Sequence, residues 1–542
     1  MLPGLMQDDF QLTLQYVLRR MRAFPGAGEV VTLTDNGVER ASHGDLVARI
    51  DRLARALTSL GIARGDRVGT FAWNTQRHVE CYLAIPCIGA VMHTINVRLF
   101  PEQVSYVINH AHDRVVFVED ALVPLLEPLV PALEHVEHFV VMGDGPTGDL
   151  PRVLRYEELL EAAGPGEAEY PQLDEREASA LCYTSGTTGN PKGVLYSHRS
   201  TTLHSAAVLM SGSLAIGSED SLLLVVPMFH VNAWGLPYAA ALSGATLIMP
   251  GRHLGAESLA KLIESERATA MACVPTLYAD LLRHADAHKP DLRSLKCAIS
   301  GGAAMPRALA QAFEERHGVS LLQAWGMTET SPLCTVARAP AGASGEEEWA
   351  IRTTQGRPVP FVELRLVDDA GAQVAWDGSS TGEIEVRGPW IASGYYKEDA
   401  LEKFDAGWLR TGDIAHVDPA GWVSITDRSK DVIKSGGEWI SSVELENQLM
   451  SHPAVREAAV IAAPNERWSE RPLACVVVED GAQVSAAELV EYLRGRVAKW
   501  WLPEEFAFVT EVPKTSVGKF DKRRLRAALA DGQLEGRTRV AD

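Results

Sequence analysis

Helical and strand patterns alternate along most of this 542-residue chain, and this alternation limits the fold more than any other feature. Leucine and isoleucine recur at gaps of three and four between residues 46 and 60, which predicts a helix with one apolar face. Gly61 suits the end of that helix, and residues 67–71 are predicted to form a short strand. Short strands separated by helices are typical of parallel α/β architecture, so this fold class is predicted.

A second unit of this kind begins with a strand at Cys297 and continues into a helix predicted at residues 306–317. Pro306 suits the first turn of that helix and Gly318 suits its end. Two further strands are predicted at residues 114–119 and 138–142. Three stretches that lack periodicity are predicted loops: 143–152, 163–170 and 338–349.

The pattern changes after about residue 427, where a compact unit of roughly a hundred residues begins. Helices are predicted there at residues 443–451 and 486–497, and strands near 458–462 and 474–478. The sequence therefore predicts a large N-terminal domain of βαβ-type subdomains at residues 1–427. A smaller α+β domain is predicted at residues 428–542, with the boundary in the polar segment 427–431.

The formal net charge of −20 bears on the class of partner. A general nucleic-acid-binding protein needs a basic face that displaces counterions, so this function class is disfavoured. A local positive site on an acidic protein can still bind a small phosphate-bearing ligand.

The seven cysteines form no C-x-x-C pair, which argues against a disulfide framework or a structural zinc site and indicates a cytoplasmic protein with ordinary buried thiols. The first ten residues include Asp8 and Asp9 and lack the basic-then-apolar pattern of a signal peptide. No stretch reaches the roughly 20 apolar residues of a membrane span, and peripheral membrane contact is left open.

The strongest local signal is the segment at residues 183–193, YTSGTTGNPKG. Its glycines let backbone N–H groups turn toward an anion, its hydroxyls add donors, and Lys192 adds a mobile positive charge. It is not a Walker A loop, because no G-x-x-x-x-G-K-[ST] pattern fits it. A flexible Ser/Thr/Gly surface loop is the alternative interpretation.

This segment resembles the signature of the adenylate-forming superfamily, which contains acyl-CoA synthetases, nonribosomal peptide adenylation domains and beetle luciferases. Further motifs follow in the order of that family between Thr184 and Lys519. The resemblance implies a large domain that binds ATP and the acyl group, followed by a small mobile domain. It also implies that ATP activates a carboxylic acid.

The segment QAWGMTET at residues 323–330 resembles the adenine and magnesium motif of the family. The resemblance implies that Trp325 stacks on adenine, that Thr328 contacts a phosphate, and that Glu329 binds Mg²⁺ together with Thr184. The alternative is a packed strand end. Asp413, in the segment LRTGD, would accept hydrogen bonds from the ribose hydroxyls, although such a segment alone is more often a turn.

Residues 427–434, DRSKDVIK, resemble the interdomain hinge of the family. The resemblance places Lys430 at the pivot and lets Arg428 reach the ribose or the phosphates. The Gly-rich face that carries Lys434 and Trp439 would turn toward the site during thioester formation. A charged surface in contact with water is the alternative for such a run.

The segment PKTSVGK at residues 513–519 resembles the catalytic-lysine loop of the family. Lys519 would place a cation against the negative charge that develops on the reacting carboxylate and the α-phosphate. The full set of nucleotide- and coenzyme-binding residues that the resemblance implies is Thr184, Ser185, Gly186, Thr187, Thr188, Gly189, Lys192, Gly302, Gln323, Ala324, Trp325, Thr328, Asp413, Arg428, Lys430, Lys434, Trp439 and Lys519. The catalytic residues that it implies are Lys519, Thr184, Glu329, Lys434 and His230.

The segment PMFHVNAWG follows an apolar strand and gathers Met, Phe, Val and Trp around His230. Core packing around a buried histidine is one interpretation. The resemblance is to the fatty acyl-CoA synthetase branch, where Val231 and Trp234 would line an acyl tunnel, with Trp234 as its gate and His230 beside the carboxylate. Gly301 and Gly302 would form a close backbone wall of the same pocket.

The sequence therefore predicts an ATP-dependent acid–CoA ligase that forms acyl-CoA, AMP and diphosphate through an acyl-adenylate, on medium- or long-chain fatty acids. ATP, Mg²⁺ and coenzyme A are the predicted cofactors. A ligase for a short thioether or another small acid is the alternative within this class. An enzyme that loads a carrier protein and a luciferase-like oxygenase are alternatives from other classes. The resemblance also implies a homodimer through the N-terminal domain.

Overall fold

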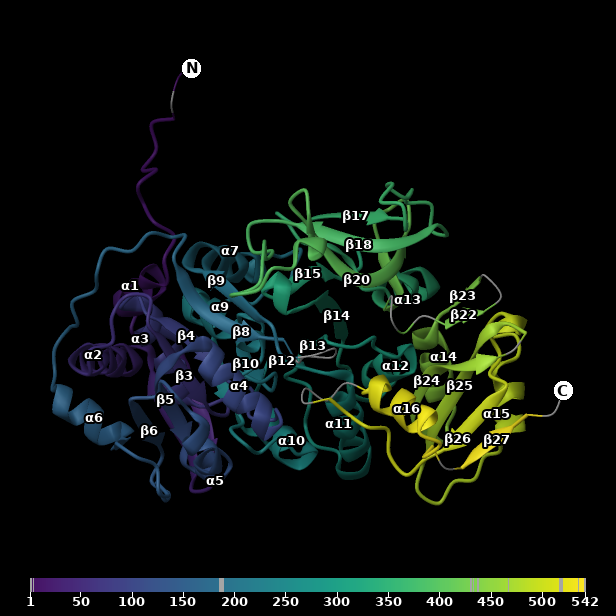
Figure 1. The fold of residues 1–542 in the computed structure, drawn as a ribbon, viewed down its shortest axis with the longest axis horizontal. Helices are drawn as coiled ribbons and strands as arrows, with labels where there is room; N and C mark the ends of the chain where they lie inside the picture. The colour runs from purple at the N-terminus through teal and green to yellow at the C-terminus, as the bar shows by residue number, and fades with distance from the viewer. Residues whose placement is uncertain are drawn as a thin grey trace.

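The computed structural model describes residues 2, 4–184, 190–428, 431, 433–435, 438–465, 467–515, 520–534 and 536–540. Its strands and helices alternate, so the predicted α/β class is confirmed. In the described part of the chain, four sheets form three neighbouring bodies, as Figure 1 shows. No helix in that part is long and apolar enough to cross a bilayer.

The first body contains a seven-stranded sheet in the order β7-β6-β5-β3-β4-β8-β9, in which only β9 runs antiparallel to its neighbour. Its strands are β3 (Arg67–Phe71), β4 (Val91–Thr94), β5 (Asp113–Glu119), β6 (His138–Met142), β7 (Val153–Arg155), β8 (Ala178–Tyr183) and β9 (Gly193–Ser197). The predicted strands at 67–71 and 138–142 are confirmed without a shift.

The same body contains a nine-stranded sheet in the order β16-β15-β14-β13-β12-β10-β11-β1-β2, with a parallel centre from β14 to β1. Its strands are β1 (Glu29–Thr34), β2 (Gly37–Ser42), β10 (Ser221–Leu224), β11 (Thr246–Met249), β12 (Ala270–Cys273), β13 (Cys297–Ser300), β14 (Leu321–Gly326), β15 (Leu333–Val336) and β16 (Arg357–Pro358).

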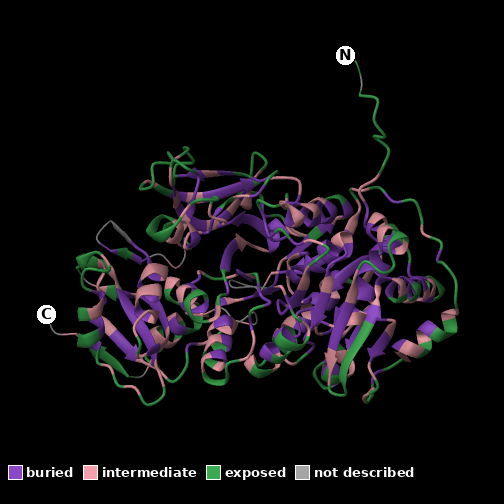
Figure 2. Ribbon diagram, turned by 180° about the vertical axis from the view of Figure 1, so that it is seen from behind, coloured by how far each residue is buried: buried purple, intermediate pink, exposed green. Residues whose placement is uncertain are grey.

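Helices cover both faces of these two sheets and give five layers. One core joins the facing sides of the sheets through the helices α1 (Leu14–Ala23), α2 (His43–Ser59), α3 (Gln76–Cys87), α6 (Tyr156–Ala163), α7 (His198–Leu209) and α9 (Leu236–Ser243). The outer faces are covered by α4 (Pro101–Ala111) and α5 (Val123–Leu126) on one sheet and by α10 (Ala256–Ser265), α11 (Pro275–His288) and α12 (Arg307–His317) on the other. Figure 2 shows the strands mostly buried and the exposed residues mostly on outer helices and loops.

Helix α2 illustrates how the local sequence produces this packing. Ser42 caps its first turn in a capping box with Asp45, which pairs backbone donors that the helix leaves free. The side chains predicted to form the apolar face, Leu46, Ile50, Leu53 and Leu57, are all buried. The predicted helix is confirmed.

The second body is a smaller five-stranded sheet of β17 (Glu363–Val367), β18 (Thr381–Arg387), β19 (Phe404–Asp405), β20 (Trp408–Val417) and β21 (Val423–Arg428). The helix α13 (Gly345–Arg352) precedes it in the chain. Because α13 starts within residues 338–349, the prediction of a loop over that whole stretch was wrong. Three acidic residues in the first turn of α13 interact favourably with the helix N-terminus, which the loop prediction overlooked.

The third body contains a six-stranded sheet with a core of its own. Its strands are β22 (Ile433–Ser435), β23 (Glu438–Ile440), β24 (Val455–Asn465), β25 (Ser469–Val478), β26 (Glu505–Phe508) and β27 (Arg537–Arg539). Its helices are α14 (Ser442–Met450), α15 (Ala486–Leu493) and α16 (Lys522–Ala530). Its two hydrophobic clusters contain only residues from Ile433 onward.

Several predicted helix ends were wrong by small amounts, and α14, predicted at residues 443–451, is shifted by one residue. Pro306 is the N-cap of α12 in extended conformation, and the first helical residue is Arg307. Helix α15 ends at Leu493, four residues before the predicted end, because its C-cap Arg494 leaves the helical region with ψ near 128°. Gly318 ends α12 in the left-handed region, as the sequence predicts.

Candidate active site

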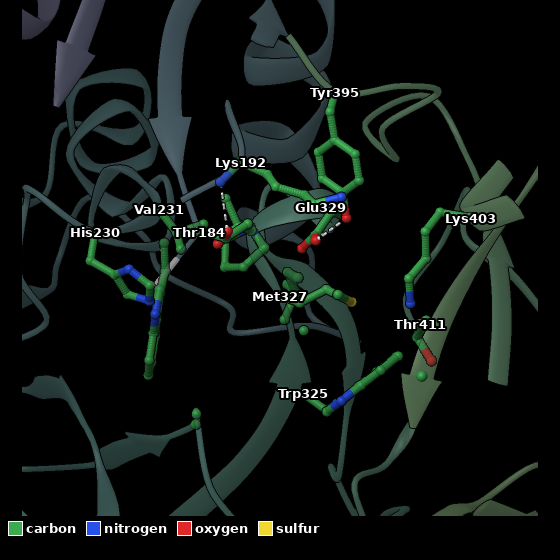
Figure 3. A pocket seen from close by; sticks show the side chains of 18 of the residues that line it. Thr184, Lys192, His230, Val231, Trp325, Met327, Glu329, Tyr395, Lys403 and Thr411 are labelled. Atoms are coloured by element: carbon green, nitrogen blue, oxygen red, sulfur yellow. Dashed lines mark hydrogen bonds between the residues drawn. The ribbon is translucent and has the colours of Figure 1, made fainter. Parts of the chain in front are cut away.

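A cavity of about 790 Å³ lies at the carboxyl ends of strands from both large sheets. This is where parallel α/β sheets place their ligands. Residues that follow β8, β10, β12 and β13 reach it, together with the end of β14. Its walls contain Thr184, Lys192, Leu214, Val226, His230, Val231, Trp234, Val274, Gly301, Gly302, Ala324, Trp325, Met327, Thr328, Glu329, Leu333, Tyr395, Lys403, Thr411 and Arg428, and many of them are drawn in Figure 3.

The two ends of the predicted phosphate loop are held together at this cavity. The Thr184 N–H donates to the Lys192 carbonyl over 2.9 Å, and the Lys192 N–H donates to the Thr184 hydroxyl over 3.1 Å. The Lys192 ammonium lies 3.2 Å from Glu398 and 4.8 Å from the centre of the Tyr395 ring. The predicted residues Ser185, Gly186, Thr187, Thr188 and Gly189 lie outside the described residues.

Glu329 presents a buried carboxylate to the cavity from the short 3₁₀ turn Thr328–Thr330. The Tyr395 hydroxyl donates to Glu329 Oε1 over 2.6 Å, as the dashed line in Figure 3 shows. Burial, with the nearby charge of Glu329, holds the pKa of Tyr395 well above its usual range, so this hydroxyl keeps its proton. The Tyr196 hydroxyl donates to the Thr328 carbonyl over 2.7 Å and fixes the same turn from the other side.

Trp325, Asp413 and Arg428 come together from three separate segments. The Trp325 indole N–H donates to Asp413 Oδ2 over 2.9 Å, and Arg428 Nε lies 3.3 Å from Asp413 Oδ1. Trp325 and Arg428 line the cavity, whereas Asp413 is buried beside it, next to the lining residues Thr411 and Gly412. The structure thus brings together three residues that the sequence analysis assigned to separate motifs.

Gln323 lies behind this wall rather than in it. Its Nε2 donates to the Ala303 carbonyl over 3.1 Å. Among the described residues, its buried Oε1 has no hydrogen-bond partner. Its neighbours Ala324 and Gly302 line the cavity, and Gly302 has a φ of +83°, a conformation that glycine adopts without strain.

The predicted acyl segment forms an unusual turn. Val231, Asn232, Ala233 and Trp234 all have φ between +47° and +60°, the left-handed region. Each such non-glycine residue costs roughly 1–2 kcal/mol, so surrounding contacts must hold the turn. Asn232 Oδ1 accepts hydrogen bonds from Thr94 Oγ1 over 3.3 Å and Cys182 Sγ over 3.1 Å.

The turn brings Trp234 against a glycine. A Cβ added to Gly301 would lie 3.0 Å from the Trp234 ring and 3.1 Å from the Ala324 carbonyl oxygen. Gly301 therefore lets the indole pack directly on the backbone at the end of β13. His230 and Val231 line the same cavity from the start of the turn.

Lys434 is a predicted residue that the structure places outside this cavity. In the described part of the chain, Lys434 lies on β22 and does not line it, and the Lys434 N–H donates to Glu470 Oε2 over 2.7 Å. Lys430 and Lys519 lie outside the described residues, and the Trp439 side chain is not described.

Sequence reasoning missed several lining residues. Tyr106 and His110 reach the cavity from α4, and Tyr395, Lys397 and Lys403 reach it from the segment before β20. These residues belong to no quoted motif, and the run of Tyr395, Tyr396 and Lys397 was the one signal that could have drawn attention to that segment.

The chain matches the AMP-binding enzyme family over residues 18–396 and the AMP-binding enzyme C-terminal domain over residues 444–519. The chain belongs to the AMP-binding enzyme family. The sequence-based assignment to the adenylate-forming superfamily is confirmed, as is the prediction of an AMP-forming acid–thiol ligase. The acid–CoA ligases of this family use ATP and coenzyme A.

Two curated relatives and one solved structure illustrate the likeness. The 3-methylmercaptopropionyl-CoA ligase of Ruegeria lacuscaerulensis is 45% identical over 96% of this chain and 98% of its own length. The long-chain-fatty-acid–CoA ligase of Thermus thermophilus is 45% identical over 97% of this chain and 96% of its own. The crystal structure of an anthranilate CoA ligase in complex with anthranoyl-AMP superposes with a TM-score of 0.88 at 28% identity, over 97% of this chain and 100% of that one.

Proposed function

We propose that this protein joins a medium- or long-chain fatty acid to coenzyme A through a fatty acyl-adenylate. One observation carries the proposal: the cavity that contains Glu329, Thr184 and Lys192 is also lined by apolar side chains, here called the apolar wall: Leu214, Val226, Val274 and Leu333. Each methylene buried against such a wall contributes about 0.8 kcal/mol, so the wall favours an alkyl chain. A cytoplasmic location and a homodimer stay predictions.

In the first half-reaction the substrate carboxylate attacks the α-phosphorus of ATP, and pyrophosphate leaves. A carboxylate is ionised at neutral pH, so this step requires no general base. Catalysis then depends on positioning and on neutralising charge. Thr184, Thr328 and Lys192 hold the phosphates, Trp325 and Asp413 hold the nucleoside, and the proposed cation at the reacting atoms is Lys519.

The donor set fits a magnesium ion that arrives with the nucleotide. In the described part of the chain, no three His, Cys, Asp or Glu side chains gather as a metal site. Mg²⁺ commonly binds through one or two carboxylates, substrate phosphates and water, so the single buried carboxylate of Glu329 suits it. Thr184 is the second proposed ligand. When bound, the ion would neutralise charge on the phosphates.

In the second half-reaction the thiol sulfur of coenzyme A attacks the acyl carbon, AMP leaves, and the thiol proton is released. We place the mobile unit at residues 428–542 and its pivot at Lys430. Rotation about the pivot withdraws Lys519 and turns Lys434 and Trp439 toward the site. A few residues that absorb a large backbone change are the usual basis of such domain motion.

A short thioether acid is the second candidate substrate. The 45% identity to a 3-methylmercaptopropionyl-CoA ligase favours it. A sulfur-containing chain of few atoms would make the same apolar contacts over a shorter length.

Pyrophosphate release over a panel of acids tests the proposal. The panel runs from C3 to C18 and includes thioether and aryl acids, each with and without coenzyme A. We expect the highest kcat/KM for an acid of medium or longer chain, and acyl-CoA formation only when coenzyme A is present. A maximum at the short thioether acid would select the second candidate, and no AMP with any acid would refute both.

Replacing Gly301 by Ala tests whether the backbone at Gly301 forms a wall of the acyl pocket. The new methyl group would press on the Trp234 ring and on the Ala324 carbonyl, which is backbone and cannot turn away. Overpacking of this kind costs about 1–3 kcal/mol, so kcat/KM for the preferred acid should fall about tenfold or more. Gly212→Ala is the control, because a Cβ there meets nothing within 4 Å. Equal activity of both variants would place the acyl chain elsewhere.

A further inference from the structure

Helix α16 begins three residues after Lys519, the last residue of the predicted catalytic-lysine loop. Phe520 follows Lys519 in the sequence, and it forms an antiparallel bridge with Lys514. The Asp521 N–H donates to the Pro513 carbonyl over 2.7 Å. The two described ends of the loop are therefore fixed to each other and to the first turn of α16.

One face of α16 is tied to the strand that leads into the proposed pivot. The Lys522 ammonium lies 2.8 Å from Glu446 Oε1 and donates to Ser442 Oγ over 2.5 Å. The Ser442 N–H donates in turn to Asp427 Oδ2 over 2.9 Å. Asp427 belongs to β21, directly before the pivot segment.

The same face of α16 is tied to the segment after the pivot. Arg526 is four residues beyond Lys522, so both side chains project from one side of the helix. Arg526 Nη1 lies 2.5 Å from Asp431 Oδ1. Helix α16 is thus linked, through Ser442, to Asp427 before Lys430 and, through Arg526, to Asp431 after it. A rotation at the pivot must act against the Ser442–Asp427 hydrogen bond, because that contact crosses the pivot.

Arg524 lies two residues from each of these anchors and therefore projects from the opposite side of the helix. Its guanidinium carbon lies 5.3 Å from the centre of the Phe100 ring, a cation–π contact. It also lies near Asp521, the N-cap residue of its own helix, with Nε 3.6 Å from Oδ2. In Figure 1, α16 lies on the side of the C-terminal sheet that faces the rest of the molecule.

Phe100 belongs to the large N-terminal body and is the N-cap residue of α4. It is 49% exposed, although large hydrophobic side chains are usually covered. Helix α4 also carries Tyr106 and His110, which line the cavity. The contact between Arg524 and Phe100 therefore brings the start of α16, and with it Phe520 just after the lysine loop, to the helix that borders the cavity.

We propose that the contact between Arg524 and Phe100 is a latch that holds the small domain in the orientation that forms the adenylate, with α16 transmitting that orientation to the lysine loop. This inference rests on the proposed function, because it assigns the two orientations to the two half-reactions. Arg524 is a positioning residue here. When the contact between Arg524 and Phe100 breaks, α16 can rotate with the small domain about the pivot. The latch therefore favours the first half-reaction and not the second.

A double-mutant cycle tests the latch on the full-length enzyme, with Arg524→Ala, Phe100→Ala and the combined variant. Each single variant should lower acid-dependent pyrophosphate release about two- to fivefold, the size expected for an exposed cation–π contact. The combined variant should lose no more than the single ones, because both remove one interaction. Thioester formation from supplied acyl-AMP and coenzyme A should keep its rate or increase.

Arg537→Ala is the matched control, because Arg537 is an exposed arginine that pairs with Glu505 within its own sheet. It should leave both half-reactions unchanged. Arg524→Lys keeps the cation and should recover part of the loss. Additive losses, equal losses in both half-reactions, or no loss would each overturn the latch while wild-type activity stands. An inactive wild type would instead refute the proposed function.

Discussion

The variant Glu329→Gln should lower acid-dependent pyrophosphate release by about 100-fold or more, because it removes the one carboxylate that we assign to the magnesium nucleotide. The carboxylate is buried, faces the cavity and accepts a hydrogen bond from Tyr395. Glutamine keeps the shape and loses the charge, so a loss of this size would report on charge and not on packing. The measurement is the initial rate of pyrophosphate release at saturating acid, over a range of Mg²⁺ concentrations.

Two further variants make this prediction specific. Tyr395→Phe removes only the hydroxyl that orients Glu329, and a loss of about tenfold is expected. Glu257→Gln removes an exposed carboxylate that pairs with Lys261 on α10, and no change is expected. If Glu329→Gln kept the wild-type rate at every Mg²⁺ concentration, the assignment of the metal to Glu329 would be wrong.

Local sequence predicted the helices and strands that are determined by residues close to one another in the chain. The apolar face of α2 follows from spacing, since burial on one side of a helix imposes a period of 3.6. Strands β3 and β6 are instead short runs buried on both faces, as parallel sheets covered by helices require. The motif segments likewise placed Thr184, Trp325 and Glu329, which all line one cavity. These residues share a site because each stands at the end of a strand or in the turn that follows one.

Contacts between residues far apart in the chain could not be predicted, because they leave no pattern in the local sequence. Tyr395 orients Glu329 across 66 positions of the chain, and the Trp325 indole meets Asp413 across 88. The left-handed turn at Val231 is not visible in its residue types, because valine is among the residues that least favour that conformation. Such a turn is stable only through tertiary contacts, here with Thr94 and Cys182, so no local rule predicts it.

Replacing Lys522 by Met should lower the free energy of unfolding of the C-terminal body by about 3–5 kcal/mol. The side chains of Lys522 and Glu446 are 11% and 9% exposed, so water can compensate the remaining charge only poorly. Asp427 is 2% exposed and shares Ser442 with Lys522. Without the Lys522 ammonium, the buried carboxylates of Glu446 and Asp427 would repel each other with no lysine cation beside them.

The loss should depend on pH with a defined sign. Burial raises the pKa of Glu446 from 4.5 to about 7, so the folded chain binds this proton more tightly than the unfolded chain. The contribution of Glu446 to the free energy of unfolding is therefore complete below about pH 4.5, and it decreases as the pH rises toward 7. The Lys522 cation stabilises the ionised form of Glu446 and so limits this decrease. Its removal therefore raises the pKa of Glu446 further. The deficit of Lys522→Met should be largest above pH 7 and smallest near pH 5.

Denaturant unfolding followed by the fluorescence of tryptophans in the C-terminal body, at pH 5.5 and pH 8, measures both effects. The combined variant Lys522→Met with Glu446→Gln should recover much of the loss at pH 8, because replacing both members of a buried pair leaves no charge uncompensated at Glu446. A single variant that lost less than about 1 kcal/mol would show that water reaches Glu446. A combined variant less stable than the single one would contradict the assigned pairing, because glutamine keeps an oxygen that can accept from the Val460 N–H, as Glu446 Oε1 does over 2.7 Å.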